Sequence, residues 1–170
     1  MTVHRTRFLA AALLCALPLA TPLSAAEWTE LSEGRQASDK VIVGGQPTKE
    51  VLQQAADAGI KVVVNMRGVD EDPGYDESAA AAELGLTYLR VPVSGAAGLT
   101  PENVHLFDAV LKQVGDQPVL MHCASGNRVG AVHALHASQY GGMDPEAAIE
   151  YGKAHGMTSL EDAVRERLEP

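Results

Sequence analysis

Cysteine is scarce in this chain of 170 residues, which contains only Cys15 and Cys123. Cys15 lies in an N-terminal segment that we expect to be removed on export, so the mature protein would keep one thiol. A single thiol cannot form an intramolecular disulfide, which excludes the class of small domains held together by a disulfide framework. An unpaired thiol in an oxidising compartment is open to oxidation, and this favours a chemical role for Cys123. The alternative is a buried, inert cysteine at the end of a strand.

Basic and aromatic residues are also few. The formal net charge is −9, and it becomes −11 if Arg5 and Arg7 leave with the N-terminal segment. Aromatic residues make up 4% of the chain, and its tyrosines are too scattered to form a stacking platform. A chain without a basic stripe cannot neutralise a phosphate backbone, so we expect no nucleic-acid partner. Any affinity for a single phosphate group must come from a local site.

A hydrophobic run long enough to cross a bilayer is absent. The longest apolar run covers residues 8–19 and is well short of the roughly 20 residues that a spanning helix needs. It follows the basic Arg5 and Arg7 and precedes the small residues Ser24, Ala25 and Ala26. This arrangement predicts a secretory signal peptide over residues 1–26, cleaved near Ala26, with export to the periplasm or the exterior. We expect no stable membrane insertion after its removal.

The composition, with 46% hydrophobic and 21% charged residues, suits one globular domain with a core. We expect a polar, irregular lead-in over residues 27–39 and a single α/β domain over residues 40–170. Apolar runs predict strands at 41–43, 61–66, 88–93 and 119–121, and helical patterns lie between and after them, at 48–58, 77–84, 100–115, 129–140, 144–155 and, capped by Ser159, up to 168. This alternation predicts a central, mainly parallel sheet of four to five strands flanked by helices. Ligands of such sheets bind at the carboxyl ends of the strands.

The stretch from Pro118 to Ala131 carries the main candidate site. A short buried strand ends at Cys123, small or turn-forming residues follow at 124–127, and a helix is favoured from Arg128 onward. In a strand, turn and helix of this kind the backbone N–H groups converge at the helix N-terminus, where an anion is favoured. A thiol at that position is expected to ionise readily. Arg128 would add a planar, bidentate donor for a phosphate-like group.

The pattern His122-Cys123 followed by Arg128 resembles the signature of the cysteine-dependent phosphatases, the protein tyrosine and dual-specificity superfamily. Most members place five residues between Cys and Arg and a Ser or Thr after Arg, whereas this chain has four residues and Val129. The shorter loop resembles a bacterial branch related to the phosphatase-like domain of β-lactamase-hydrolase-like proteins, and residues 44–47 resemble the opening of that branch. The loop is also similar to that of rhodanese-type sulfurtransferases.

The resemblance implies a dual-specificity phosphatase-like fold and hydrolysis of a phosphomonoester through a thiophosphate on Cys123. Arg128 would bind the phosphoryl oxygens, and the phosphate-binding loop would comprise His122, Ala124, Ser125, Gly126 and Asn127, with His122 ordering the loop. The implied partner is a phosphorylated small molecule or a phosphoprotein. No cofactor is expected. No metal is expected either, because His133 and His136 share a helix face but no third ligand is spaced nearby.

The general acid of the resembled phosphatases has no obvious counterpart. In that family an Asp follows the strand that ends like Val91-Pro92-Val93, whereas Ser94, Gly95 and Ala96 stand here. An acidic loop could supply a substitute if it folds over the site, and the alternative is a solvated surface loop. Its candidate acids are Asp70, Glu71, Asp72, Asp76 and Glu77. Arg67 and Ser94, at strand ends, could help to bind an anion, and Arg67 could equally pair with the acidic loop.

Three classes of function therefore remain open. A phosphomonoester hydrolase is favoured by the overall pattern and by His122. A sulfurtransferase or persulfide carrier is favoured by the four-residue gap, because a shorter turn makes a tighter anion site. A non-catalytic module that binds phosphate or another oxyanion is favoured by the missing acid, since acid catalysis commonly contributes about 10²–10⁴-fold in rate.

Overall fold

A computed structural model describes residues 34–169 and shows one five-stranded sheet. The expected signal peptide lies outside the described residues. The strands are β1 (Arg35–Gln36), β2 (Val41–Gly44), β3 (Val62–Asn65), β4 (Thr87–Arg90) and β5 (Val119–His122), in the order β1-β2-β5-β3-β4. Only β1 is antiparallel to its neighbour, and the other pairs are parallel. The predicted α/β fold with a mainly parallel sheet is confirmed.

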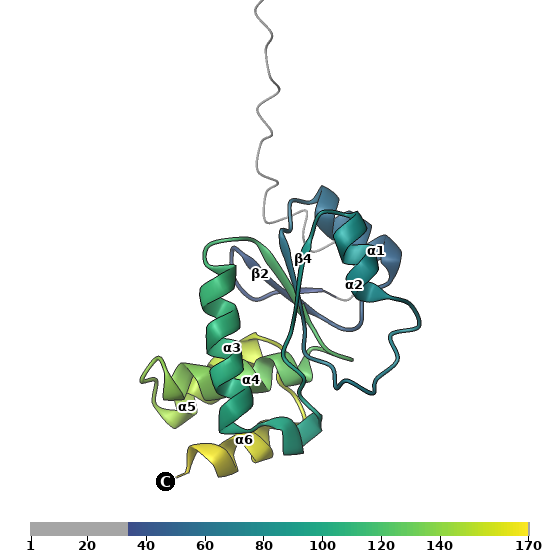
Figure 1. The fold of residues 1–170 in the computed structure, drawn as a ribbon. Coiled ribbons are helices and arrows are strands. Elements are labelled where there is room, and N and C mark those ends of the chain that lie inside the picture. Colours follow the sequence, from purple (N-terminus) through teal and green to yellow (C-terminus); the bar gives the residue numbers. More distant parts are fainter. Residues whose placement is uncertain (1–33, 170) are drawn as a thin grey trace, which may run out of the picture.

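Helices cover both faces of the sheet (Figure 1). On one face lie α1 (Lys49–Asp57) and α2 (Glu77–Glu83), and on the other lie α3 (Pro101–Val114), α4 (Asn127–Gln139), α5 (Pro145–Ala154) and α6 (Glu161–Leu168). A short 3₁₀ helix, η2 (Gly95–Gly98), precedes α3. None of the helices within the described part combines the length and apolar character needed to cross a bilayer.

The sheet separates two hydrophobic clusters. Ile42, Val63 and Leu120 pack with the α1 and α2 side, whereas the strand residues beside them, such as Val62 and Met121, pack with the α3 to α6 side. Because the central strands are buried on both faces, their sequences are nearly continuous apolar runs rather than alternating ones. Because such runs can be located in the sequence, the positions of the central strands could be predicted.

Most helix starts follow their capping residues. The side chains of Thr48, Asp76, Thr100 and Asp144 each accept a hydrogen bond from the backbone N–H three residues later. In α3 and α5 a proline occupies the first turn, where a missing N–H costs nothing. These local contacts explain why the predicted bounds of α1, α3 and α5 agree with the structure to within a residue or two.

Four local features differ from the sequence prediction. The lead-in contains the edge strand β1, which is too short and polar to leave an apolar pattern. The strand predicted to reach Val93 ends at Arg90, and the helix expected from Val129 begins at Asn127. Ser159 does not cap α6, which begins at Glu161 after Leu160. Its hydroxyl instead accepts a hydrogen bond from Asn127 Nδ2 at 2.8 Å.

Candidate active site

The loop after β5 lies at the carboxyl edge of the sheet, between the ends of β2 and β3. Cys123 N donates to Gly44 O at 3.4 Å, and Gly45 forms an isolated antiparallel bridge with Ser125. Gly126 then has a φ of 85°, in the left-handed region, and a Cβ there would lie 3.2 Å from Val43 Cγ1. Glycine is therefore required where the chain turns from the strand into α4.

The sulfur of Cys123 lies at the base of this turn. It accepts a hydrogen bond from the Gly126 N–H at 3.1 Å, at the start of the thirteen-residue helix α4. The amide dipoles of α4 therefore place partial positive charge beside the sulfur. Cys123 is 1% exposed, whereas Ala124 and Ser125 above it are exposed. Such burial is compatible both with a nucleophile at the bottom of a pocket and with the inert cysteine.

Arg128 is the second residue of α4. Its guanidinium donates to both oxygens of the Glu71 carboxylate, with Nη2 at 2.9 Å from Oε2, and Nη1 also donates to Val93 O at 2.8 Å. The hydrogen bond with Glu71 is the main reason why the pKa of Arg128 is raised. A fork-like ion pair with Glu71 thus holds the guanidinium at the N-terminal turn of α4.

Glu71 shows that the acidic loop folds over the site. Its carboxylate accepts from the Gly68 N–H at 2.6 Å, from Arg67 Nε at 3.2 Å and from Arg128. The hydrogen bond from Arg128 is the main reason why the pKa of Glu71 falls to about 2. At neutral pH Glu71 therefore carries no proton that it could give to a leaving group.

The other acids of the loop have separate places. Asp76 is exposed and caps α2 by accepting from Ala79 N at 2.9 Å. The exposed Asp72 accepts from Gly74 N at 2.7 Å, and Asp70 is exposed. Only Glu77, the first residue of α2, is buried among these carboxylates, at 2% exposure. The structure thus places Glu71 next to Arg128. The five acidic residues of the loop do not form one cluster.

Glu77 and His122 form a buried pair beneath the loop. His122 Nε2 lies 2.7 Å from Glu77 Oε1, although the angles fall outside those of a well-formed hydrogen bond, and His122 Nδ1 lies 3.4 Å from Cys123 O. Glu77 Oε2 accepts from Asn65 Nδ2 at 2.9 Å and from Gln46 Nε2 at 3.2 Å. Burial alone would raise the pKa of Glu77, but the contacts with His122 and the two amides outweigh it and lower the pKa. Glu77 therefore holds His122 under the loop.

Each of the three guanidinium nitrogens of Arg67 donates a hydrogen bond to a neighbouring loop. Nε donates to Glu71, Nη1 to Gln46 Oε1, and Nη2 to Asp72 O at 2.9 Å. The structure thus favours the ion pair with the acidic loop over direct anion binding. Arg90, which the sequence analysis missed, donates from Nη2 to Gly68 O at 3.1 Å and so fixes the start of the same loop. Asn65 and Gln46 were missed too, although a polar Asn at the end of the run Val62–Asn65 could have indicated a buried partner.

A family model described as "DSP-PTPase phosphatase fused to NAD+ Kinase" matches residues 17–164. The chain belongs to this dual-specificity-type phosphatase family. A Beta-lactamase hydrolase-like protein of Xylella fastidiosa (strain Temecula1) is 32% identical over 123 residues, which cover 70% of this chain and 28% of that protein. A Beta-lactamase hydrolase-like protein of Agrobacterium fabrum is 27% identical over 123 residues, again 70% of this chain and 28% of that protein. The chain thus spans less than a third of the length of these relatives.

Solved structures of phosphatases share the fold. A Neisseria meningitidis protein named as a phosphatase is 25% identical with a TM-score of 0.64, over 79% of this chain and 95% of that one. A DUF442 protein of Shewanella putrefaciens, also named as a phosphatase, is 20% identical with a TM-score of 0.63, over 85% and 96%. The sequence resemblance to the dual-specificity phosphatases is confirmed at the level of family and fold.

The segment where the resembled phosphatases place an acid is a turn of small residues in this family member. Ser94 is exposed, and η2 follows it with Gly98, whose Cβ would lie 2.9 Å from Val93 C. Arg167 of α6 donates to Ala96 O and Leu99 O, each at 2.7 Å. The helix α6 therefore fixes this turn. Arg128 receives a backbone oxygen from Val93, just before the turn, and the turn offers no carboxylate.

Asn127 has an anchoring role in this phosphatase fold. Its Oδ1 accepts from Thr158 N at 2.8 Å and from Leu160 N at 3.4 Å, and its Nδ2 donates to Ser159. The side chain thereby ties the start of α4 to the connection between α5 and α6. Sequence reasoning placed Asn127 in the phosphate-binding loop, and its side chain is committed to this anchor.

Among residues 34–169 no group of three or more His, Cys, Asp or Glu side chains could hold a metal ion. His133 and His136 do share α4, and both rings pack on Phe107, but their other neighbours differ. His133 is buried and stacks on His155 with ring centroids 4.2 Å apart, whereas His136 Nε2 lies 3.1 Å from Asp108 Oδ1. Both histidines are accounted for by packing between α3, α4 and α5.

Proposed function

We propose that this chain is a cysteine-dependent phosphomonoester hydrolase. In the first step the Cys123 thiolate attacks phosphorus, the bond from phosphorus to the ester oxygen breaks, and the leaving alcohol takes up a proton. In the second step water attacks the thiophosphate, the phosphorus–sulfur bond breaks, and inorganic phosphate and the thiolate are released. Arg128 and the loop amides stabilise the phosphoryl oxygens in both steps. The observation that carries the proposal is the Cys123 sulfur, which accepts the Gly126 N–H at the N-terminus of α4, the helix whose second residue is Arg128.

Glu71 is a positioning residue in this mechanism, because it contacts Arg128 rather than the reacting atoms. Its bidentate contact fixes the plane and direction of the guanidinium, which saves orientation entropy when the phosphoryl group binds. With a pKa of about 2 it is ionised and does not act as the general acid. The proton for the leaving oxygen then comes from water or from another loop acid. Aryl phosphates are therefore the preferred test substrates, because their leaving groups need little help from an acid.

The family and two neighbours by fold support the proposed substrate class. PTPMT1 has been solved with PI(5)P and TpbA of P. aeruginosa with pTyr, with TM-scores of 0.57 and 0.53 and identities of 21% and 18%. These ligands support a phosphomonoester on a small molecule or on a protein as the substrate. Together with the expected export, this would place the activity outside the cytoplasm.

The decisive experiment measures phosphate release from 4-nitrophenyl phosphate by the wild-type protein, Cys123→Ser and Arg128→Lys. We expect steady release by the wild type, background release by Cys123→Ser, and a strong reduction by Arg128→Lys, which keeps the charge but loses the planar fork. Circular dichroism of each variant controls for folding, and binding of inorganic phosphate to Cys123→Ser controls for an intact site.

Three other outcomes would contradict the cysteine-dependent hydrolase. Thiocyanate formation from thiosulfate and cyanide without phosphate release would identify a sulfurtransferase. Phosphate binding without either reaction would identify a non-catalytic oxyanion-binding module. Release that persists in folded Cys123→Ser would remove the sulfur from the mechanism.

A further inference from the structure

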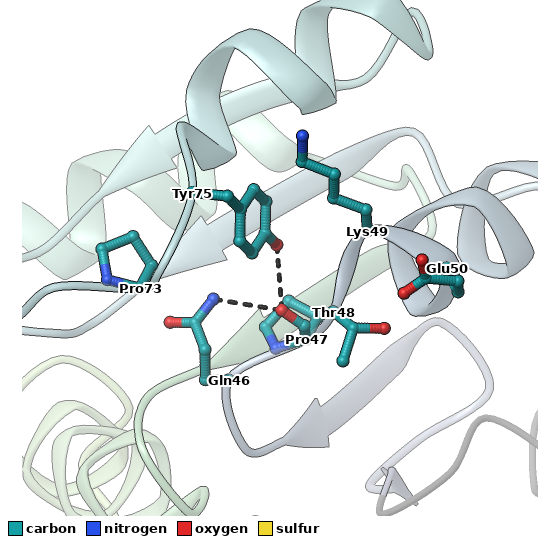
Figure 2. A pocket seen from close by; sticks show the side chains of 7 residues that line it. All are labelled: Gln46, Pro47, Thr48, Lys49, Glu50, Pro73 and Tyr75. Atoms are coloured by element: carbon teal, nitrogen blue, oxygen red, sulfur yellow. Dashed lines mark hydrogen bonds between the residues drawn. The ribbon is translucent and has the colours of Figure 1, made fainter.

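A cavity of about 320 Å³ lies between the start of α1 and the acidic loop. One wall is the connection from β2 into α1, residues 46–50, and the other is formed by Pro73 and Tyr75 of the acidic loop. Figure 2 shows the Tyr75 hydroxyl directed across to the other wall, where it donates to Pro47 O at 2.9 Å. This hydrogen bond and the half-buried ring give the cavity a fixed floor.

Both walls continue directly into the candidate active site. Gln46 follows Gly45, which pairs with Ser125 of the phosphate-binding loop, and the Gln46 side chain contacts Arg67 and Glu77. The opposite wall belongs to the loop whose Glu71 holds Arg128. The alcohol portion of a phosphomonoester bound at Cys123 would extend past Gln46 to reach this cavity.

Lys49 supplies a positive charge to the cavity. Its Nζ lies 5.6 Å from the centroid of the Tyr75 ring, and among the described residues it forms no ion pair. Arg67 and Arg128, by contrast, are both paired with Glu71. Once a phosphoryl group occupies the loop, Lys49 is the positive side chain of the adjoining cavity.

Glu50 also lines the cavity, and its charge opposes that of Lys49. Figure 2 shows the Glu50 side chain on the opposite side of the helix start, away from the Tyr75 ring. Its pKa is lowered first by its own backbone N–H, then by Thr48 and least by the charge of Lys49, so the carboxylate is engaged mainly with the first turn of α1. The positive end of the α1 dipole lies at the same place and adds to the attraction that Lys49 exerts on an anion.

We propose that Lys49 and Tyr75 select phosphomonoesters whose alcohol portion carries a second negatively charged group. This inference rests on the proposed hydrolase function and adds a specificity determinant to it. The second group, a carboxylate or another phosphate, would lie near Lys49, and the body of the alcohol would lie against Tyr75, Pro47 and Pro73. In a protein with a net charge of −9, such a local positive site is needed to accept a doubly anionic substrate.

The test compares kcat/KM for 3-carboxyphenyl phosphate with that for 3-carbamoylphenyl phosphate, which has nearly the same shape without the charge. We expect the wild type to prefer the carboxylate by about two- to fivefold, as an exposed ion pair allows. Lys49→Gln should lower this ratio to one or below, Lys49→Arg should retain it, and added salt should reduce it. Lys61→Gln is the matched control, because Lys61 is exposed and precedes β3 at the opposite edge of the sheet.

The outcomes separate this inference from the proposed function. Hydrolysis of both esters with a ratio that Lys49→Gln leaves unchanged, or that Lys61→Gln lowers equally, would overturn the selection by Lys49 and leave the hydrolase intact. Failure of the wild type to hydrolyse either ester would overturn the hydrolase and the inference together.

Discussion

At the scale of single residues, Glu71 connects the acidic loop to the phosphate-binding loop. Its carboxylate joins Arg67, Arg128 and the Gly68 N–H, so one side chain sets the position of the guanidinium and of the loop start. A carboxylate held by two arginines is a strong acceptor and a poor acid, because each donor stabilises the ionised form. The same contacts that exclude Glu71 as a proton donor make it suited to positioning Arg128.

Glu71→Gln is expected to lower kcat/KM for 4-nitrophenyl phosphate by about ten- to a hundredfold, because a misplaced guanidinium loses transition-state contacts. The ratio of kcat/KM between 4-nitrophenyl phosphate and phenyl phosphate should stay close to that of the wild type, since a positioning residue acts on both substrates alike. Steady-state kinetics with the two esters measure both quantities.

The matched control is Glu83→Gln, which removes the same charge from an exposed position at the end of α2 and should leave both rates unchanged. A selective loss of phenyl phosphate hydrolysis in Glu71→Gln would instead assign a proton-donating role to Glu71. The wild-type pH profile provides a second check, because a pKa of about 2 leaves no titration of Glu71 between pH 5 and 8.

At the scale of elements, the close approach of α4 to α5 supports the phosphate-binding loop from behind. A Cβ at Gly130 would collide with the backbone at Met157 N and Gly152 O, and would lie 2.8 Å from Met157 Cα. A Cβ at Gly156 would lie 3.1 Å from Gly126 O. The segment that ends α5 therefore lies directly against the turn that carries Cys123.

Gly130→Ala is expected to lower the free energy of unfolding by about 2 kcal/mol, near the middle of the range for overpacking, because the neighbouring atoms are backbone and cannot rotate away. Helix propensity acts in the opposite direction and favours alanine by only about 1 kcal/mol. Urea unfolding followed by circular dichroism measures the difference, and hydrolysis of aryl phosphates should fall as well.

The control for helix propensity is Gln139→Ala at the exposed end of α4, which should change stability by less than about 0.5 kcal/mol. A Gly130→Ala protein as stable as the wild type, or more stable, would show that α4 and α5 can separate without cost.

At the scale of the whole molecule, buried histidines couple stability to pH. His133 and His155 stack between α4 and the end of α5, and both are nearly inaccessible to solvent. Burial is the first cause that lowers the pKa of each below its usual value of 6.5, and the nearby His155 adds to the effect on His133. The folded protein therefore keeps both rings neutral at pH values at which the unfolded chain binds protons.

We expect the free energy of unfolding to decrease as the pH falls below about 6.5, the unfolded value, and to keep decreasing until the folded pKa values are reached. The sign follows because the unfolded state binds more protons in this window. Each histidine contributes at most about 1.4 kcal/mol per pH unit. Urea titrations at pH 7.5, 6.5 and 5.5 measure the slope, in a range where the carboxylates stay ionised.

His155→Gln should reduce this slope whatever its effect on the absolute stability. His105→Gln, at an exposed position on α3, should leave the slope unchanged. A wild-type stability that is flat from pH 7.5 to 5.5 would contradict the burial of two neutral imidazoles.

The sequence predicted most of the fold because its patterns are local. The apolar runs of the central strands and the caps Thr48, Thr100 and Asp144 each depend on neighbouring residues, so they could be located without tertiary information. The two-residue strand β1 could not, because its pairing with β2 comes from contacts across the sheet edge. Ser159 was assigned as a cap for the same reason, since its real partner, Asn127, is 32 residues away.

The candidate site also has features that depend on adjacent residues and features that depend on tertiary contacts. By itself the sequence determined the α/β class, the strand, turn and helix around Cys123, and the presence of Arg128 at a helix N-terminus, because these follow from residues adjacent in the chain. Only the tertiary structure decided that Glu71 contacts Arg128, that Glu77 lies under His122, and that Arg67 holds the acidic loop. The side chains of that loop could have been solvated or folded inward with the same composition. Their positions are set by charges and hydrogen-bond partners that come together only when the carboxyl ends of β3, β4 and β5 meet.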